Sequence, residues 1–239
     1  MSDWLQIALI TLLAGLAMPA GAALASAERI RPRWLENELR HGVIAFGGGA
    51  LLAAVALVLV PEGVRGLSTV TVTVCFAAGA LAFMALDRAL ARNGTPMGQL
   101  VAMLADFVPE ALALGATFVT SHSAGVVLAA IIGLQNVPEG FNAWRELSRA
   151  THYGARRLIG AFTAMALLGP VFGVAGYFFL SSQPAIVSGI MLFAAGGILY
   201  LIFQDIAPQV RLRNHWAPPL GALAGFLAGL VGHLLVHGG

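Results

Sequence analysis

The feature that most constrains this chain is a series of apolar runs, each about 20 residues long, that fill most of the sequence. As an α-helix, a run of about 20 residues crosses the hydrocarbon core of a bilayer. Only 10% of the residues are charged, whereas soluble domains carry roughly a quarter. We therefore expect an all-α membrane protein surrounded by lipid, built as one polytopic domain over residues 1–239. Its eight expected spans are 4–25, 42–60, 67–86, 98–120, 123–144, 157–180, 184–204 and 217–236.

The basic residues predict how these spans are oriented. All 13 basic residues are arginines, and 12 of them follow the first, third, fifth and seventh spans or lie at the ends of those spans. Only Arg65 falls on the opposite side. Because arginine-rich loops stay in the cytoplasm, we expect both termini outside. A basic sequence can indicate nucleic-acid binding, but here the orientation of the helices accounts for the arginines. We therefore expect no nucleic-acid partner. The 12 arginines are Arg29, Arg31, Arg33, Arg40, Arg88, Arg92, Arg145, Arg149, Arg156, Arg157, Arg211 and Arg213.

Three carboxylates lie inside the expected spans 98–120 and 123–144: Asp106, Glu110 and Glu139. A carboxylate at the bilayer centre costs about 2.5–3.5 kcal/mol on insertion scales. Neither span contains a basic residue short of its end that could pair with them. Protonation, which could serve a proton path, or a purely structural role is the alternative, but a bound cation satisfies all three together. The carboxylates therefore predict a cation site.

The spacing of the polar residues favours a single site. Asp106 and Glu110 are four residues apart, so they project from one face of a helix. Gln135, Asn136 and Glu139 occupy one turn of the next span. Because both groups reach the middle of the membrane, we expect the three carboxylates to coordinate a cation while Gln135 and Asn136 supply amide oxygens.

Proline precedes the carboxylate in both spans, as Pro109 and Pro138. Proline removes one helical hydrogen bond and frees a carbonyl group one turn earlier. Membrane helices tolerate this loss where the loosened backbone lines a cavity. A third copy of the pattern, Val60-Pro61-Glu62-Gly63, closes the second span. These repeats hint at an internal symmetry.

The string Gln135-Asn136-Val137-Pro138-Glu139-Gly140 resembles the fifth-helix motif of the ZIP (Zrt-/Irt-like) family of divalent metal transporters. Asp106-Phe107-Val108-Pro109-Glu110 is similar to the fourth-helix motif of that family, and Phe46-Gly47-Gly48-Gly49 to the start of its second helix. The chain looks like a divergent member of prokaryotic type. The resemblance implies eight helices with outside termini, a divalent cation as substrate with no organic cofactor, a homodimer, and the inner membrane of a bacterium.

The chain also departs from the family pattern. Asp106 replaces the usual histidine, Phe107 replaces a polar residue, and Gly169-Pro170 occupies the region where the sixth helix commonly carries a carboxylate. A long histidine-rich loop is missing, and all six histidines fall at span ends or in loops. One altered site is thus favoured over a two-metal centre. The family carries zinc, iron and manganese, and an all-oxygen ligand set favours manganese or iron.

Three functions remain open from the sequence. The first is a transporter that passes a divalent cation by alternating access, with Glu62 at the outer side and Gln204 and Asp205 at the cytoplasmic side as further binding positions. The second is an intramembrane enzyme with paired carboxylates as acid and base. The chain has no nucleophile elbow and no zinc-protease string, so we expect no enzyme. The third is a non-transporting relative that acts as a sensor or structural partner.

Overall fold

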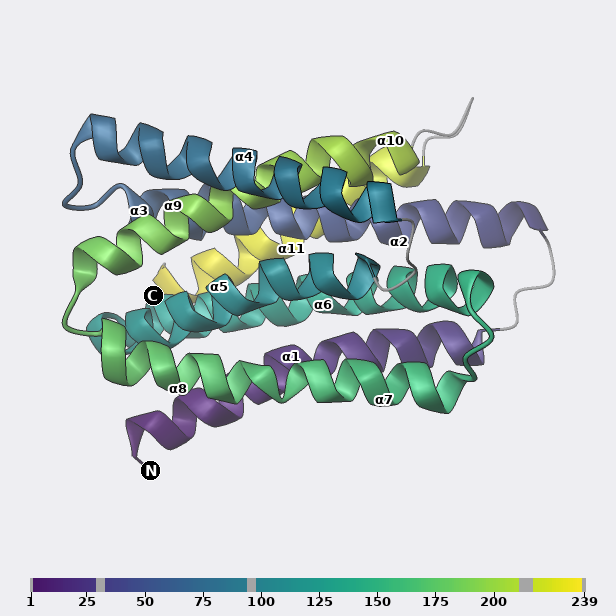
Figure 1. The fold of residues 1–239 in the computed structure, drawn as a ribbon, viewed down its shortest axis with the longest axis horizontal. Coiled ribbons are helices and arrows are strands. Elements are labelled where there is room, and N and C mark those ends of the chain that lie inside the picture. The colour runs from purple at the N-terminus through teal and green to yellow at the C-terminus, as the bar shows by residue number, and fades with distance from the viewer. Residues whose placement is uncertain (1, 29–32, 94–97, 211–216, 238–239) are drawn as a thin grey trace.

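The structure, a computed structural model, describes residues 2–28, 33–93, 98–210 and 217–237, without the side chains of 33–37, 93, 98, 99, 102, 120, 236 and 237. All regular structure in these residues is helical, and the helices run roughly alongside one another (Figure 1). The elements are α1 (Asp3–Ala27), α2 (Arg33–Ala54), η1 (Val55–Leu59), α3 (Val60–Gly63), α4 (Thr69–Asn93), α5 (Gly98–Thr120), α6 (His122–Ala150), α7 (Ala155–Ala166), α8 (Leu168–Leu180), α9 (Pro184–Leu201), η2 (Ile202–Ile206), α10 (Ala207–Gln209) and α11 (Ala217–His237).

Long helical segments stand where each of the eight spans was expected. Seven of them, within the described residues, are long and apolar enough to cross a membrane. The remaining expected span, 98–120, is the 23-residue helix α5. The prediction of an all-helical, multi-pass membrane protein is therefore confirmed over the described residues. The side on which the termini lie stays a prediction, and Arg29, Arg31, Arg211 and Arg213 are outside the described residues.

Two spans differ in detail from the expectation. The sixth is broken into α7 and α8 at Leu167, because Pro170 has no N–H to donate to the carbonyl of Ala166. The seventh runs on past residue 204 through a π-helical turn, η2, and ends at Gln209. This extension carries Asp205 and Gln209 on a continuous helical segment rather than in a loop.

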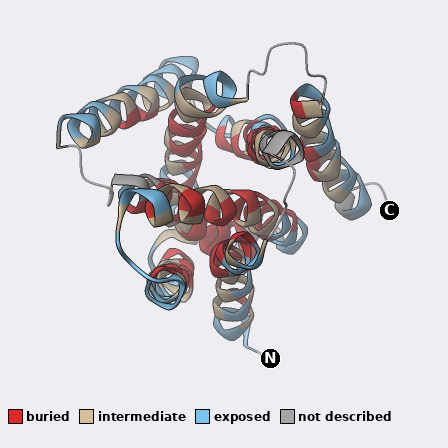
Figure 2. Ribbon diagram, turned by 90° about the vertical axis from the view of Figure 1, so that its right-hand side faces the viewer, coloured by how far each residue is buried: buried red, intermediate tan, exposed pale blue. Residues whose placement is uncertain are grey.

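The outside of the bundle is apolar. Buried residues face its middle and exposed residues lie around its periphery (Figure 2). Large hydrophobic side chains are among the exposed ones, including Leu13 at 68%, Phe179 at 75% and Leu235 at 78%. An apolar surface of this extent would be unstable in water. The surface therefore agrees with lipid surroundings.

Four helix pairs form the framework of the bundle: α1 with α6, α2 with α11, α4 with α9, and α5 with α8. Each pair is joined by two glycines, one from each helix, that lie against the partner backbone. In the α1–α6 pair, a Cβ atom at Gly21 would lie 2.0 Å from the Val137 carbonyl oxygen, and one at Gly140 would lie 2.0 Å from that of Met18. Such contacts let the two backbones approach more closely than any side chain would allow.

The helix pairs follow an internal two-fold pattern. Exchanging α1 with α7–α8, α2 with α9, α4 with α11, and α5 with α6 turns each pair into another of the four. The interface glycines Gly49 and Gly196 are 147 residues apart, and so are Pro61 and Pro208. A π-helical turn precedes each of these prolines, η1 in one half and η2 in the other. The symmetry that the short proline strings hinted at is thus present in the fold.

Candidate metal centre

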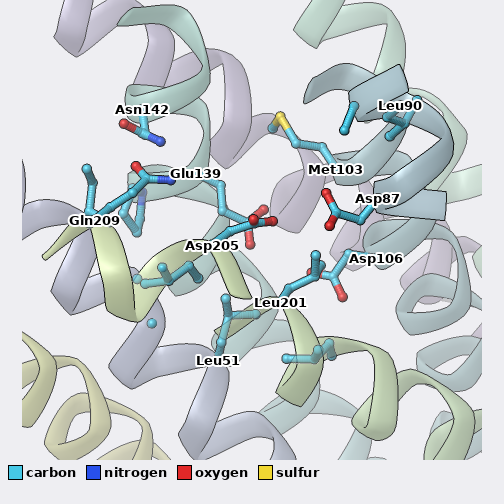
Figure 3. A pocket seen from close by; sticks show the side chains of 17 residues that line it. Leu51, Asp87, Leu90, Met103, Asp106, Glu139, Asn142, Leu201, Asp205 and Gln209 are labelled. Atoms are coloured by element: carbon cyan, nitrogen blue, oxygen red, sulfur yellow. The ribbon is translucent and has the colours of Figure 1, made fainter. Parts of the chain in front are cut away.

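A cavity of about 410 Å³ lies between α2, α4, α5, α6 and the α9–η2–α10 segment. It is near the end of the bundle where α4 ends and α5 begins, and the exposed residues Ala91 and Gln209 at its rim connect it with the surface. Four carboxylates line it: Asp87, Asp106, Glu139 and Asp205. Figure 3 shows these side chains around the same space.

Asp106 and Glu139 bring the carboxylates of α5 and α6 to this cavity. Asp106 is 5% exposed, and its Oδ1 atom has no hydrogen-bond partner among the described residues. Buried polar atoms without a partner are rare and call for an explanation such as an ion or water. The two carboxylates repel each other electrostatically. A cation between them would relieve that repulsion and occupy the free oxygen.

Glu110 lies away from the cavity and is paired with Gln135. The Nε2 atom of Gln135 donates to both carboxylate oxygens of Glu110, at 2.8 and 2.9 Å, and both side chains are fully buried. The Oε1 atom of Gln135 has no partner among the described residues. In the two-fold pattern, Glu110 corresponds to Glu139 and Gln135 to Asp106, because each lies at the same distance from Pro109 or Pro138. The pair is therefore the counterpart of the cavity carboxylates.

Asn136 points in a third direction. Its Nδ2 atom donates to the carbonyl oxygen of Ala14 in α1 at 2.9 Å. The side chain is 1% exposed and does not line the cavity. Its observed role is to join α6 to α1.

The five residues expected to form one site are thus distributed over three neighbouring environments. Glu110 interacts electrostatically with Asp106 and with Glu139, so all three carboxylates are near one another. Among the described residues, however, no three side chains of histidine, cysteine, aspartate or glutamate lie close enough together to hold one metal ion. In this conformation, an ion between Asp106 and Glu139 would need further ligands from neutral groups or water.

Further residues at the cavity had no place in the sequence-based site. Asp87 directly follows the expected span 67–86, and its Oδ2 accepts a 3.0 Å hydrogen bond from the Tyr200 hydroxyl, which joins α4 to α9 beside the cavity. Asp205 reaches it from η2. Asn142 lies one turn after Glu139, and Met103 one turn before Asp106. For Asn142 and Met103, the signal available in the sequence was their spacing of one helical turn from Glu139 and Asp106.

Phe107 occupies buried space next to the candidate site. It is 2% exposed, and its ring lies against both Gly15 of α1 and Gly169 of α8. A Cβ atom at either glycine would approach the Phe107 Cζ atom to 2.9–3.0 Å. Phe107 therefore serves as an apolar contact between three helices.

A comparison with protein-family models gives no match, and a comparison with curated proteins gives none.

Proposed function

We propose that this protein is a transporter that moves a divalent transition-metal ion, of the manganese, iron and zinc class, across the membrane. The observation that carries the proposal is the buried Asp106, whose Oδ1 atom has no partner, beside Glu139 in a cavity inside a membrane bundle. Buried carboxylates in a membrane segment are costly, and they commonly mark an ion pathway. The resemblance of the helix motifs to the ZIP family supports the same function.

The arrangement of charges supports a pathway rather than an isolated site. Asp87 and Asp205 also line the cavity and are less buried than Asp106, so an ion that passes from the surface to Asp106 would meet further carboxylates. If the arginine-rich side is cytoplasmic, this cavity faces the cytoplasm, and the conformation is inward-facing. Alternating access requires a second conformation in which a cavity opens at the other end of the bundle. The two-fold pattern supports it, because exchanging the conformations of the two related halves would produce such a cavity.

Transport is tested with purified protein in lipid vesicles loaded with a metal-sensitive dye. We expect Mn²⁺ or Fe²⁺ added outside to enter vesicles that contain the protein and not empty ones, and Asp106→Asn to reduce the rate strongly. Val101→Leu, on the same helix and 41% exposed, is the control for effects of expressing, purifying and reconstituting a variant. Saturable binding without uptake would instead support a sensor. If neither binding nor uptake occurs, the metal function is refuted and the enzymatic and structural functions lead.

A further inference from the structure

The cavity contains one residue whose chemistry differs from that of the other lining groups. Met103 of α5 is 4% exposed and lines the same cavity as Asp106, which follows it by one turn. Figure 3 shows its side chain, with the sulfur in yellow, among the labelled lining residues. The other apolar lining side chains are hydrocarbon, and Cys75, the single cysteine, does not line the cavity. The Met103 thioether is thus the one sulfur group among the described lining residues.

An ion in this cavity needs neutral ligands. Asp106 and Glu139 supply carboxylate oxygens, but a third carboxylate, histidine or cysteine does not come close enough among the described side chains. The neutral groups at hand are the Asn142 amide oxygen, which has no hydrogen-bond partner among the described residues, the Gln209 amide and the Met103 sulfur. The identity of these neutral ligands then decides which ion completes its coordination most favourably.

We propose that the Met103 thioether is a specificity-determining ligand that raises the affinity of the cavity for softer divalent ions such as Cd²⁺ relative to harder ones such as Mn²⁺. Hard cations such as Mg²⁺ and Ca²⁺ bind oxygen ligands. Thioether sulfur binds softer, more polarizable metals and adds little for hard ones. A site of two carboxylates and one thioether therefore retains affinity for Mn²⁺ through its oxygens, and gains affinity for Fe²⁺ or Cd²⁺ through its sulfur. This inference rests on the proposed metal function of the same cavity.

The two-fold pattern locates the thioether on one side of the site only. The position that corresponds to Met103 on α6 is Ile132, because each lies six residues before the proline of its helix. Ile132 is 1% exposed and does not line the cavity. The Met103 sulfur is thus a local difference between α5 and α6. A variant that replaces this side chain with a hydrocarbon one would leave the other equivalent positions of the two helices unchanged.

The test compares Met103→Leu with Met191→Leu, a control on α9 that is 2% exposed and outside the cavity. Methionine and leucine have similar volumes, so neither change should disturb folding strongly. In titrations of purified protein with Cd²⁺ and Mn²⁺, we expect Met103→Leu to weaken Cd²⁺ binding about tenfold and to leave Mn²⁺ binding within about threefold. Met191→Leu should change neither.

A second measurement reports directly on the ligand atoms. The ¹¹³Cd resonance of the wild-type complex should lie downfield of a complex with oxygen ligands alone, and Met103→Leu should remove that difference. If wild type binds Cd²⁺ and Mn²⁺ but Met103→Leu has the same ratio of affinities and the same resonance, the role of Met103 is refuted while the metal site stands. If wild type binds no divalent ion, the proposed function fails and this inference fails with it.

Discussion

The Gln135 amide on α6 holds both carboxylate oxygens of Glu110 on α5, at 2.8 and 2.9 Å, in a fully buried position. This contact uses the oxygens of Glu110 that a shared metal site would require. Asp106, one turn away on the same helix, keeps an unpartnered oxygen and faces the cavity. The two carboxylates of α5 thus have different environments although they are on one helix.

The first prediction separates these two environments. Asp106→Asn and Glu139→Gln should each abolish most metal binding, and the double variant should lose little more, because ligands that act as a unit are not additive. Glu110→Gln should weaken binding less, since Glu110 does not line the cavity. Isothermal titration with Mn²⁺ compares the four variants with the wild type. If Glu110→Gln is as damaging as Glu139→Gln, the ion binds to the wider set of residues expected from the sequence and not at the cavity.

A second prediction concerns pH. Protons and a divalent ion compete for the same oxygens of Asp106 and Glu139, so metal binding should release protons and strengthen as pH rises. Titrations in buffers of different ionisation enthalpy give the number of protons released. Carboxylates buried in a low dielectric titrate between about pH 5 and pH 8, so binding that is unchanged over this range would show that the ligands hold no protons before the metal binds.

The third prediction concerns the ion pair that joins α1 to α6 at the end of both helices. Arg145 Nη1 lies 2.8 Å from Glu28 Oε2, and their side chains are 9% and 13% exposed. Removing one partner leaves a charge in a poorly solvated position, so Glu28→Gln should lower the free energy of unfolding by ~1.5–3 kcal/mol. Thermal unfolding in detergent measures the change.

The matched control for that ion pair is Glu62→Gln. Arg65 Nη1 lies 2.7 Å from Glu62 Oε2, but the Arg65 side chain is 70% exposed. An exposed pair contributes at most about 1 kcal/mol, so this variant should be nearly neutral. Equal effects of the two substitutions would show that burial does not set the strength of the Glu28–Arg145 pair.

A fourth prediction tests the close packing of α1 on α6. A Cβ atom at Gly140 would lie 2.0 Å from the Met18 carbonyl oxygen, whereas one at Gly133 on the same helix would have its nearest neighbour, Ala14 Cα, at 3.8 Å. Gly140→Ala should therefore force the helices apart and destabilise the protein by about 1–3 kcal/mol. Gly133→Ala should be neutral or slightly stabilising. Thermal unfolding distinguishes the two, and similar melting temperatures would contradict the interface.

The fifth prediction is the orientation in the membrane. The loops after the first, third, fifth and seventh spans should be cytoplasmic, because they carry the arginines. With Cys75 replaced by serine, single cysteines introduced at Gly66 and at Gly154 should differ in labelling by an impermeant reagent in intact cells. Gly66 should react and Gly154 should not. The reverse result would invert the assigned topology.

The positions of the helices and their membrane-spanning character could be predicted from the sequence. Both depend on the length of each apolar run and on the charges that flank it, which are local properties of the chain. The site could be predicted only in part. Asp106 and Glu139 were identified from the cost of burying a charge, but Asn136 and Glu110 could not be assigned their partners. The Ala14 carbonyl that Asn136 contacts is 122 residues away along the chain, and no spacing rule reveals such a contact. Asp87 was missed as a cavity residue because it lies at the end of a span, where a charge is ordinary. Asp205 was expected only as a further position at the cytoplasmic side, and the extension of the seventh span by η2 brings it to the cavity.

The π-helical turns η1 and η2 have a consequence for comparison with other chains. Each contains five residues, Val55–Leu59 and Ile202–Ile206, and a π-helical turn accommodates one residue more than an α-helical turn. A chain that lacks one residue in either turn can keep the same helix faces on both sides of it. An alignment without gaps would then assign the residues after the turn to the wrong side of the helix, and Gln209 would be compared with a residue that lies one position away in the fold. Single-residue gaps belong in these two turns when homologous positions are sought.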